Sequence, residues 1–223
     1  YREACDNPPV RHIQYLWNPN TTWATGRNIL FETAMNRNKT YLYYIFFDDD
    51  IVLIDLKKTN PWRKFEAFLR SVEPAIGAID VDDYVSVIRK NHRKRHCNLE
   101  EKEYITCMWY DATLNAFHHK AVHYILPYDL TYDKENWWAG HMVVIIRSEI
   151  LFRGQLVFHT EVIGVNTKHT KQYPRSLYYS LPMFEVWLSG LVERHLHADR
   201  ERLQCAKLLA KRWKKLGRKH GWS

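Results

Sequence analysis

The strongest hydrophobic signal in the chain is the run YLYYIFF at residues 41–47, which ends in Asp48, Asp49 and Asp50 and resumes as IVL at residues 51–53. An aromatic and β-branched run of this length is too short for a helix of several turns and is typical of a strand buried in a covered sheet. Three neighbouring carboxylates at the edge of a core require a cationic neighbour, because like charges repel and burial of unpaired charge is costly. We therefore expect a cation at the end of this strand.

The remaining hydrophobic pattern alternates between strand and helix periodicity. The first predicted helix begins at the Thr25-Gly26 pair and carries apolar positions up to Met35. The other predicted helices are residues 61–72, 116–126, 137–152 and 181–219. The other predicted strands are residues 10–17, 75–79, 85–88, 104–110 and 156–165. This order predicts a single α/β domain over residues 1–223, with the α/β core in residues 1–180 and a basic amphipathic helix in a C-terminal extension at residues 181–223.

Composition supports one well-filled core, because 46% of the 223 residues are hydrophobic. No run approaches the roughly 18–20 apolar residues of a membrane helix, and residues 1–9 are not a signal peptide. The chain begins at Tyr1 without a methionine, which we interpret as a processed or trimmed piece of a longer protein. Any contact with a membrane would then be made by a segment absent from this chain.

The net charge of +8 is concentrated in two tracts, residues 89–95 and 207–219. Both tracts could attract phosphate-rich or sulfated partners, although a solvated loop and the wet face of a helix are the more frequent explanations. The sequence carries no nucleic-acid recognition motif, so we expect no nucleic-acid partner.

The cysteines and glycosylation sequons indicate the compartment. Cys5, Cys97, Cys107 and Cys205 allow two disulfides in three pairings, and no Cys-x-x-Cys pattern suggests zinc or redox chemistry. Asn-x-Thr sequons begin at residues 20 and 38. Both observations favour a lumenal setting in the secretory pathway, such as the Golgi, or an extracellular one.

The three aspartates are the first candidate site. In an extended strand Asp48 and Asp50 point to one side, while Asp49 points to the other and is left for a supporting contact. Two carboxylates suit Mg²⁺ or Mn²⁺, which take few protein ligands and complete their shell with water and phosphate oxygens. This chemistry predicts a substrate that bears a diphosphate. The alternative is an acidic turn after a core strand.

Arg27 and Asn28 are the second candidate site, at the head of the helix that precedes the acidic strand. The guanidinium offers a planar fork of donors and the amide offers both a donor and an acceptor, so the pair could hold a ribose, base or phosphate edge. The alternative is a surface arginine beside a helix-capping asparagine.

The order TGRN at residues 25–28, one helix, then FFDDDI at residues 46–51 resembles the metal-binding half of the GT-A glycosyltransferases. These enzymes contain an Asp-x-Asp motif, and Asp48 and Asp50 of this chain would correspond to its two acids. The resemblance implies a Rossmann-like domain with a central mixed sheet flanked by helices. It also implies a nucleotide-sugar donor, with a UDP-sugar as our first choice, and Mn²⁺ or Mg²⁺ as cofactor.

The resemblance also assigns residues outside the two motifs. Glu135, which precedes the helix at residues 137–152, matches the acid that acts as catalytic base, and His169 matches the histidine that completes the metal shell. His159 is the rival of His169. Asp111, His118 and His119 are alternative acceptor-side residues.

The function we expect is transfer of a hexosyl or N-acetylhexosaminyl group from a nucleotide-diphosphate sugar to a hydroxyl of a glycan, glycoprotein or other acceptor. The donor would be held by Asp48, Asp49, Arg27 and Asn28. The metal would be bound by Asp48, Asp50 and His169. The acceptor proton would be removed by Glu135 or Asp111. The alternative is an inactive GT-A-like module that binds an anionic glycan or a protein.

Overall fold

The computed structural model describes residues 16–81, 103–107, 109–134 and 136–167, which form an α/β arrangement. The described helices are α2 (Trp23–Met35), α3 (Pro61–Val72), α5 (His119–Ile125) and α6 (Trp137–Leu151). The described strands are β1 (Tyr43–Phe47), β2 (Ile51–Asp55), β3 (Ile76–Val81), β4 (Tyr104–Thr106), β5 (Leu114–His118) and β6 (Leu156–Asn166). The predicted α/β class, with a mixed sheet and flanking helices, is confirmed.

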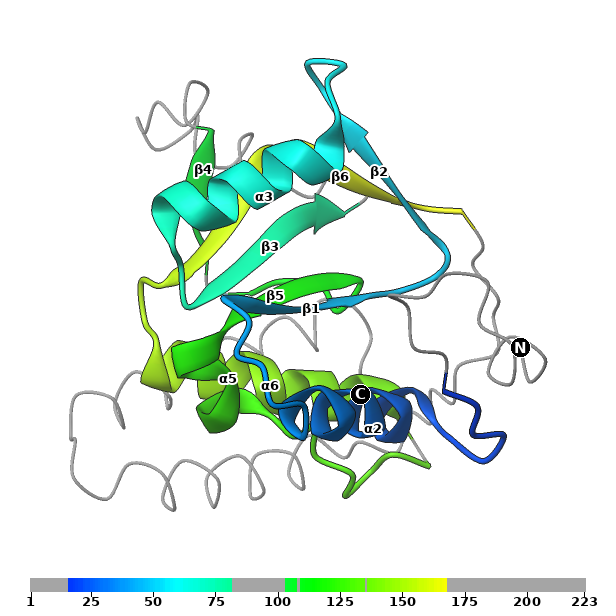
Figure 1. Cartoon of the computed structure of the whole chain (residues 1–223). Helices are drawn as coiled ribbons and strands as arrows, with labels where there is room; N and C mark the ends of the chain where they lie inside the picture. The colour runs from blue at the N-terminus through cyan, green and yellow to red at the C-terminus, as the bar shows by residue number, and fades with distance from the viewer. Residues whose placement is uncertain (1–15, 82–102, 108, 135, 168–223) are drawn as a thin grey trace, which may run out of the picture.

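The six strands form one mixed sheet in the order β1-β5-β3-β6-β2, and β4 pairs with β6 beside this path. β5 is antiparallel to both β1 and β3, and β3 is parallel to β6. β1, β3 and β6 therefore run in one direction, and Figure 1 shows β3 and β6 ending on the side where the chain turns from β1 into β2.

The sheet is strongly curled because its two outermost strands are consecutive in the chain. β1 and β2 stand at opposite ends of the sheet order, yet Asp48, Asp49 and Asp50 alone separate them. The four steps from Phe47 to Ile51 span at most about 14 Å, whereas five flat strands would place β1 and β2 about 19 Å apart. Curling closes this gap. We call residues 48–50 the aspartate link.

Helices cover both faces of the curled sheet. Figure 1 shows α2, α5 and α6 on one side of β1 and β5, and α3 on the other. Phe46 and Phe117 lie in the core on the first side, and Phe65 and Leu69 of α3 lie in the core on the second. Gly77 of β3 permits the close approach of α3, since a Cβ atom there would lie 2.3 Å from a Leu69 methyl group.

Several predicted elements are confirmed where the local pattern was complete. α3 has the predicted bounds, with Pro61 at its first position and the Asn60 side chain accepting a hydrogen bond from the Arg63 N–H. α6 and β6 each differ by one residue from their predicted ends. Their long apolar runs lie in the core, as the sequence indicates.

The strand predicted over residues 41–47 is confirmed as β1, but the prediction that it is fully buried is wrong. The apolar residues before and after the aspartates form β1 and β2, which lie at the two ends of the sheet. In β1, Tyr44 and Phe46 are buried, but Ile45 and Phe47 are 45% and 38% exposed. The strand alternates because one face packs against α2 and its neighbours while the other is only partly covered.

Three further boundaries are corrected. The helix predicted over residues 116–126 begins at His119, because residues 114–118 form β5 and pair with β1 and β3 on either side. α2 begins at Trp23, not Thr25, because Thr22 and Thr25 form a reciprocal capping box. β4 covers residues 104–106 of the predicted 104–110.

Other predicted elements lie outside the described residues. They are residues 10–15 of the first strand, the strand at 85–88, the helix at 181–219, and Cys5, Cys97 and Cys205. The last two residues of the predicted first strand, Leu16 and Trp17, are described and are not in a strand.

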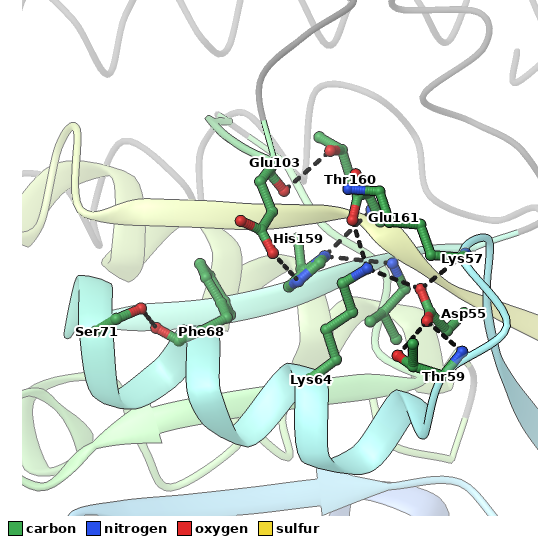
Figure 2. Close-up of polar contacts among 11 residues, drawn as sticks. Asp55, Lys57, Thr59, Lys64, Phe68, Ser71, Glu103, His159, Thr160 and Glu161 are labelled. Atoms are coloured by element: carbon green, nitrogen blue, oxygen red, sulfur yellow. Dashed lines mark hydrogen bonds and ion pairs between the residues drawn. The ribbon is translucent and has the colours of Figure 1, made fainter.

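A cluster of charged side chains fastens α3 to the paired strands β2 and β6, as Figure 2 shows. The Lys64 ammonium group lies 2.9 Å from an Asp55 oxygen and also pairs with Glu161, whose other oxygen lies 2.7 Å from the Lys57 ammonium group. Burial opposes ionisation of Asp55, but donors from Thr59, Lys64 and the backbone hold its pKa well below its usual value. The cluster fixes β2, and with it one end of the aspartate link.

Removal of Lys64 is expected to cost much more stability than removal of Lys57, whose side chain is far more exposed. The Lys64 side chain is 14% exposed and that of Lys57 is 66% exposed. Lys64→Met leaves the buried Asp55 charge without its cation and should lower the free energy of unfolding by about 3 kcal/mol. Lys57→Met should lower it by less than about 1 kcal/mol. Urea unfolding measures both values, and equal losses in the two variants would contradict this account.

Candidate functional site

The start of α2 presents two side chains to the aspartate link. Thr22 caps the helix by accepting a hydrogen bond from the Thr25 N–H, and Trp23 and Arg27 are four residues apart and therefore share one face. The Arg27 guanidinium carbon lies 4.1 Å from the centroid of the Trp23 ring. This stacking restricts the position of the guanidinium group independently of its ion pair with a carboxylate.

The first aspartate of the link is bound by Arg27. The guanidinium Nη2 pairs with Asp48 Oδ1 and donates to the Ala112 carbonyl at 3.0 Å, and Nη1 donates to the Tyr128 hydroxyl at 3.1 Å. Trp23 Nε1 lies 3.4 Å from the same Asp48 oxygen. Arg27 is buried, so Asp48 is the counter-charge that makes its burial tolerable.

Groups around the Asp48 carboxyl shift its pKa in opposite directions. Burial raises its pKa, the Arg27 guanidinium and the Trp23 N–H lower it, and the charge of Asp50 raises it again. The last of these influences is the repulsion between the negative charges of Asp48 and Asp50. A further cation beside Asp50 would relieve this repulsion.

A neutral histidine, His141, packs against the Trp23 ring. Burial and the Arg27 charge lower the pKa of His141 to about 3, although its contact with the Tyr110 carbonyl opposes the shift. The His141 Nε2 atom lies 2.9 Å from that carbonyl oxygen. His141 therefore adds no positive charge to the site.

Asn28 contacts the loop that follows α5. Its Nδ2 donates to the Tyr128 carbonyl at 2.9 Å, and its Oδ1 accepts from the Tyr128 N–H at 2.7 Å. The two bonds place Tyr128 under the Arg27 guanidinium. Arg27 and Asn28 thus contact groups of the protein itself, and both side chains are buried.

Asp49 and Asp50 lie in the turn between β1 and β2. Asp49 is exposed and Asp50 is half-buried, and within the described residues neither carboxylate has a hydrogen-bond or ion-pair partner. The Asp50 carbonyl accepts hydrogen bonds from both the N–H and the hydroxyl of Thr167, each at 2.8 Å. The end of β6 therefore lies beside Asp50. His169, two positions further along the sequence, is outside the described residues.

Asp111 belongs to the loop that contacts the other end of the link. Its Oδ1 accepts from the Thr113 N–H at 3.0 Å, and the Thr113 carbonyl accepts from the Asp48 N–H at 2.9 Å. The next residue, Ala112, is the one whose carbonyl binds Arg27. The structure therefore brings this loop and Asp48 together, whereas Glu135 is outside the described residues.

The candidate histidines lie away from the link. His118 pairs in register with Tyr43, at the opposite end of β1 from Asp48, and its Nε2 atom lies 3.1 Å from a Glu73 oxygen. His119 follows it at the start of α5. His159 is opposite Ile79 in the sheet, before the five residues of β6 that pair with β2. The four steps along the strand from the first to the last of these five residues span about 13 Å, so His159 lies still further from the link.

Three contact residues were missed in the sequence. Tyr128 is one of them, because no local sequence pattern connects it to Arg27. Trp23 lies four residues before Arg27, a spacing that was visible once the helix start was placed correctly. Thr167 follows a predicted strand, but its contact with Asp50 depends on the pairing of β6 with β2.

A comparison of the chain with protein-family models and with curated proteins finds no match. Within residues 16–81, 103–107, 109–134 and 136–167, no three His, Cys, Asp or Glu side chains are grouped so that they could hold a metal ion. No helix in the same ranges combines the length and the apolar character needed to cross a membrane.

Loss of the Arg27 charge is expected to destabilise the fold through Asp48. Arg27→Met leaves the Asp48 carboxylate without its main partner and should lower the free energy of unfolding by about 3 kcal/mol. Adding Asp48→Asn removes the stranded charge and should recover part of this loss.

The matched control is Arg63→Met, whose side chain is 80% exposed on α3. Denaturant unfolding of the four proteins measures the effect, and the control should cost less than about 1 kcal/mol. If the double variant is no more stable than Arg27→Met, the loss comes from packing and not from the unpaired charge.

Proposed function

We propose that this chain is a metal-dependent glycosyltransferase whose cation binds at Asp50 together with the diphosphate of a nucleotide-sugar donor. The observation that carries the proposal is the unequal state of the aspartates. Arg27 binds Asp48, whereas no described residue binds the carboxylates of Asp49 and Asp50. A half-buried carboxylate without a partner among the described residues favours an external cation.

The available ligands suit a hard cation that shares its shell with substrate. Carboxylate oxygens are the ligands of Mg²⁺ and Mn²⁺, and Mg²⁺ in particular is bound through one or two carboxylates plus phosphate oxygens and water. In the proposed site the diphosphate supplies part of the shell, and His169, which lies outside the described residues, stays a candidate ligand. Metal and nucleotide should therefore bind together and weakly when apart.

The position of the aspartate link in the fold supports the same assignment. Ligands of open α/β sheets collect outside the carboxyl ends of the strands, and the link begins where β1 ends, on the side towards which β3 and β6 run (Figure 1). The resemblance of residues 25–28 and 46–51 to the GT-A glycosyltransferases specifies a nucleotide sugar as the donor. UDP is the first nucleotide to test.

The proposed reaction is transfer of the sugar to an acceptor hydroxyl. The bound cation would offset the negative charge of the departing diphosphate. Asp111 is the described carboxylate whose loop contacts Asp48 and Arg27, so it is a candidate to accept the hydroxyl proton in an inverting reaction. Glu135 stays the other candidate. Asp48 acts in this scheme through Arg27, as the residue that positions the link.

Thermal unfolding with a panel of nucleoside diphosphates tests the proposal, with each nucleotide measured in Mn²⁺ and in chelator. A nucleotide present at about a hundred times its dissociation constant stabilises the folded state by about 2.7 kcal/mol, which corresponds to a rise in Tm of roughly 5–10 °C for a chain of this size. We expect this rise for one nucleotide and only with metal.

Asp50→Asn should abolish the metal-dependent rise. The matched control is Glu66→Gln, which removes an exposed carboxylate on α3 and should leave the rise unchanged. No shift with any nucleotide, or an equal shift in Asp50→Asn and the wild type, would overturn the proposal.

A further inference from the structure

The strand β6 changes its neighbouring strand between His159 and Val162. Before this point Tyr104 of β4 is opposite His159, and after it Asp55 of β2 is opposite Val162. Against β3 the register is broken at the same place, since Ile79 is opposite His159 but Asp80 is opposite Ile163. Three residues of β6 therefore form a bulge where one partner strand replaces another.

The side chain of His159 holds this bulge from inside. The ring is fully buried, and its Nδ1 atom accepts hydrogen bonds from the N–H groups of Glu161 at 3.1 Å and Val162 at 3.3 Å. An acceptor at Nδ1 requires the neutral imidazole with its proton on Nε2. The Nε2 atom lies 3.6 Å from an oxygen of Glu103.

Charged groups from two strands, one helix and the residue before β4 surround the ring. Glu103 lies just before β4, Glu161 is in the bulge, Asp55 ends β2 and Lys64 projects from α3. The Phe68 ring of α3 packs edge-on against the imidazole, with centroids 5.3 Å apart. The three carboxylates favour a charged ring, whereas Lys64 and burial oppose it. Figure 2 shows His159 between Glu103 and the Lys64 cluster.

The bulge determines what the rest of β6 reaches. From Val162 to Asn166 the strand pairs in register with β2, and the next residue, Thr167, donates two hydrogen bonds to the Asp50 carbonyl. A shift of one residue in β6 would turn every following side chain to the other face of the sheet. It would also remove Thr167 from Asp50.

We propose that neutral His159 is a positioning residue for the aspartate link: it fixes the β6 bulge that brings Thr167 to Asp50, and protonation of its Nδ1 atom releases the bulge. An imidazolium ion has two donors and no acceptor, so the N–H groups of Glu161 and Val162 lose their partner. The link to function rests on the proposed metal and nucleotide site at Asp50. The release of the bulge does not.

The balance of the surrounding groups supports the neutral ring near neutral pH. Burial lowers the pKa of His159 and Lys64 lowers it further, although Glu103, Glu161 and Asp55 oppose the shift. A histidine whose folded-state pKa is depressed contributes stability that is complete above its unfolded value of about 6.5 and is lost as the pH falls through the folded value. The bulge should therefore loosen below pH 6.5.

Amide hydrogen exchange and ring-nitrogen NMR test the release directly. Between about pH 7.5 and pH 5, protection of the Glu161 and Val162 amides, corrected for intrinsic exchange, should fall by about tenfold or more, because the opened bulge lets His159 take up a proton that the closed bulge disfavours. Protection of the Phe68 and Leu69 amides in α3 should change less. Unchanged protection at Glu161 and Val162 across this range would overturn the inference.

His159→Asn supplies the matched variant, because the Asn side-chain oxygen takes the place of Nδ1 and does not titrate. This variant should keep the bulge protected at both pH values, whereas His159→Leu should lack the protection at both. If His159→Leu does not fold, the comparison of His159→Asn with the wild type still decides. Loss of bulge protection in His159→Asn at low pH, equal to that in the wild type, would contradict a role for His159.

The functional arm repeats the nucleotide and Mn²⁺ thermal shift at both pH values. The wild type should lose several-fold more affinity at low pH than His159→Asn does, since only the wild type releases Thr167. Equal losses would show that the bulge does not control the link. Absence of any nucleotide shift at neutral pH would instead refute the proposed function, and the hydrogen-exchange result would still decide the state of the bulge.

Discussion

The ion pair between Arg27 and Asp48 is the interaction on which the arrangement of this site depends. It joins the second turn of α2 to the point where β1 ends, and it does so with a guanidinium group that is already stacked on Trp23 and bonded to Tyr128 and Ala112. A buried arginine needs a carboxylate, and a carboxylate at the end of a core strand needs a cation. Each group makes the burial of the other possible.

The curl of the sheet gives this ion pair a mechanical role. The aspartate link joins the two outermost strands, so the link must span a gap that a flat sheet would not allow. Asp48 is fixed at one end by Arg27 and by the Thr113 carbonyl, and Asp50 is fixed at the other by Thr167. The link is thus clamped through its first side chain and its last carbonyl group. The carboxylates of Asp49 and Asp50 are left for other partners.

The charges of the three aspartates therefore separate into two roles. Asp48 neutralises a cation of the protein, and Asp50 remains close enough to raise the pKa of Asp48 further. This division explains why an acidic strand end is compatible with a stable fold before any ligand binds. It also explains why a site for an external cation would contain few protein ligands and would depend on the substrate to complete them.

The sequence predicted the elements whose signals are local. Pro61 and the apolar face of residues 61–72 were enough for α3, and long apolar runs were enough for α6 and β6. Prediction failed where pairing between distant segments decides the structure. Residues 116–118 have a helical pattern but lie in β5 between two strands. The apolar residues before and after the aspartates lie at opposite ends of the sheet because they pair with β5 and β6.

The candidate site follows the same rule. Its acids and Arg27 were recognised from composition and spacing, since three adjacent carboxylates are an electrostatic problem in any fold. The pairing of Arg27 with Asp48 could not be predicted, because it requires the position of α2 against the end of β1. Tyr128 and Thr167 enter the site through long-range contacts alone. The acidic pattern thus indicated that a cation lies nearby. The fold determines which aspartate pairs with Arg27.

Paramagnetic broadening of backbone amide resonances by Mn²⁺ tests the central claim most directly, because the broadening falls steeply with distance from the ion. In the presence of the nucleoside diphosphate that stabilises the protein, Mn²⁺ should broaden the amides of Asp49, Asp50 and Thr167 much more than those of His118 and His119 at the far end of β1. Mg²⁺ in place of Mn²⁺ should restore the signals. Broadening centred elsewhere, or none at the aspartate link, would contradict the assignment of this link as the metal and nucleotide site.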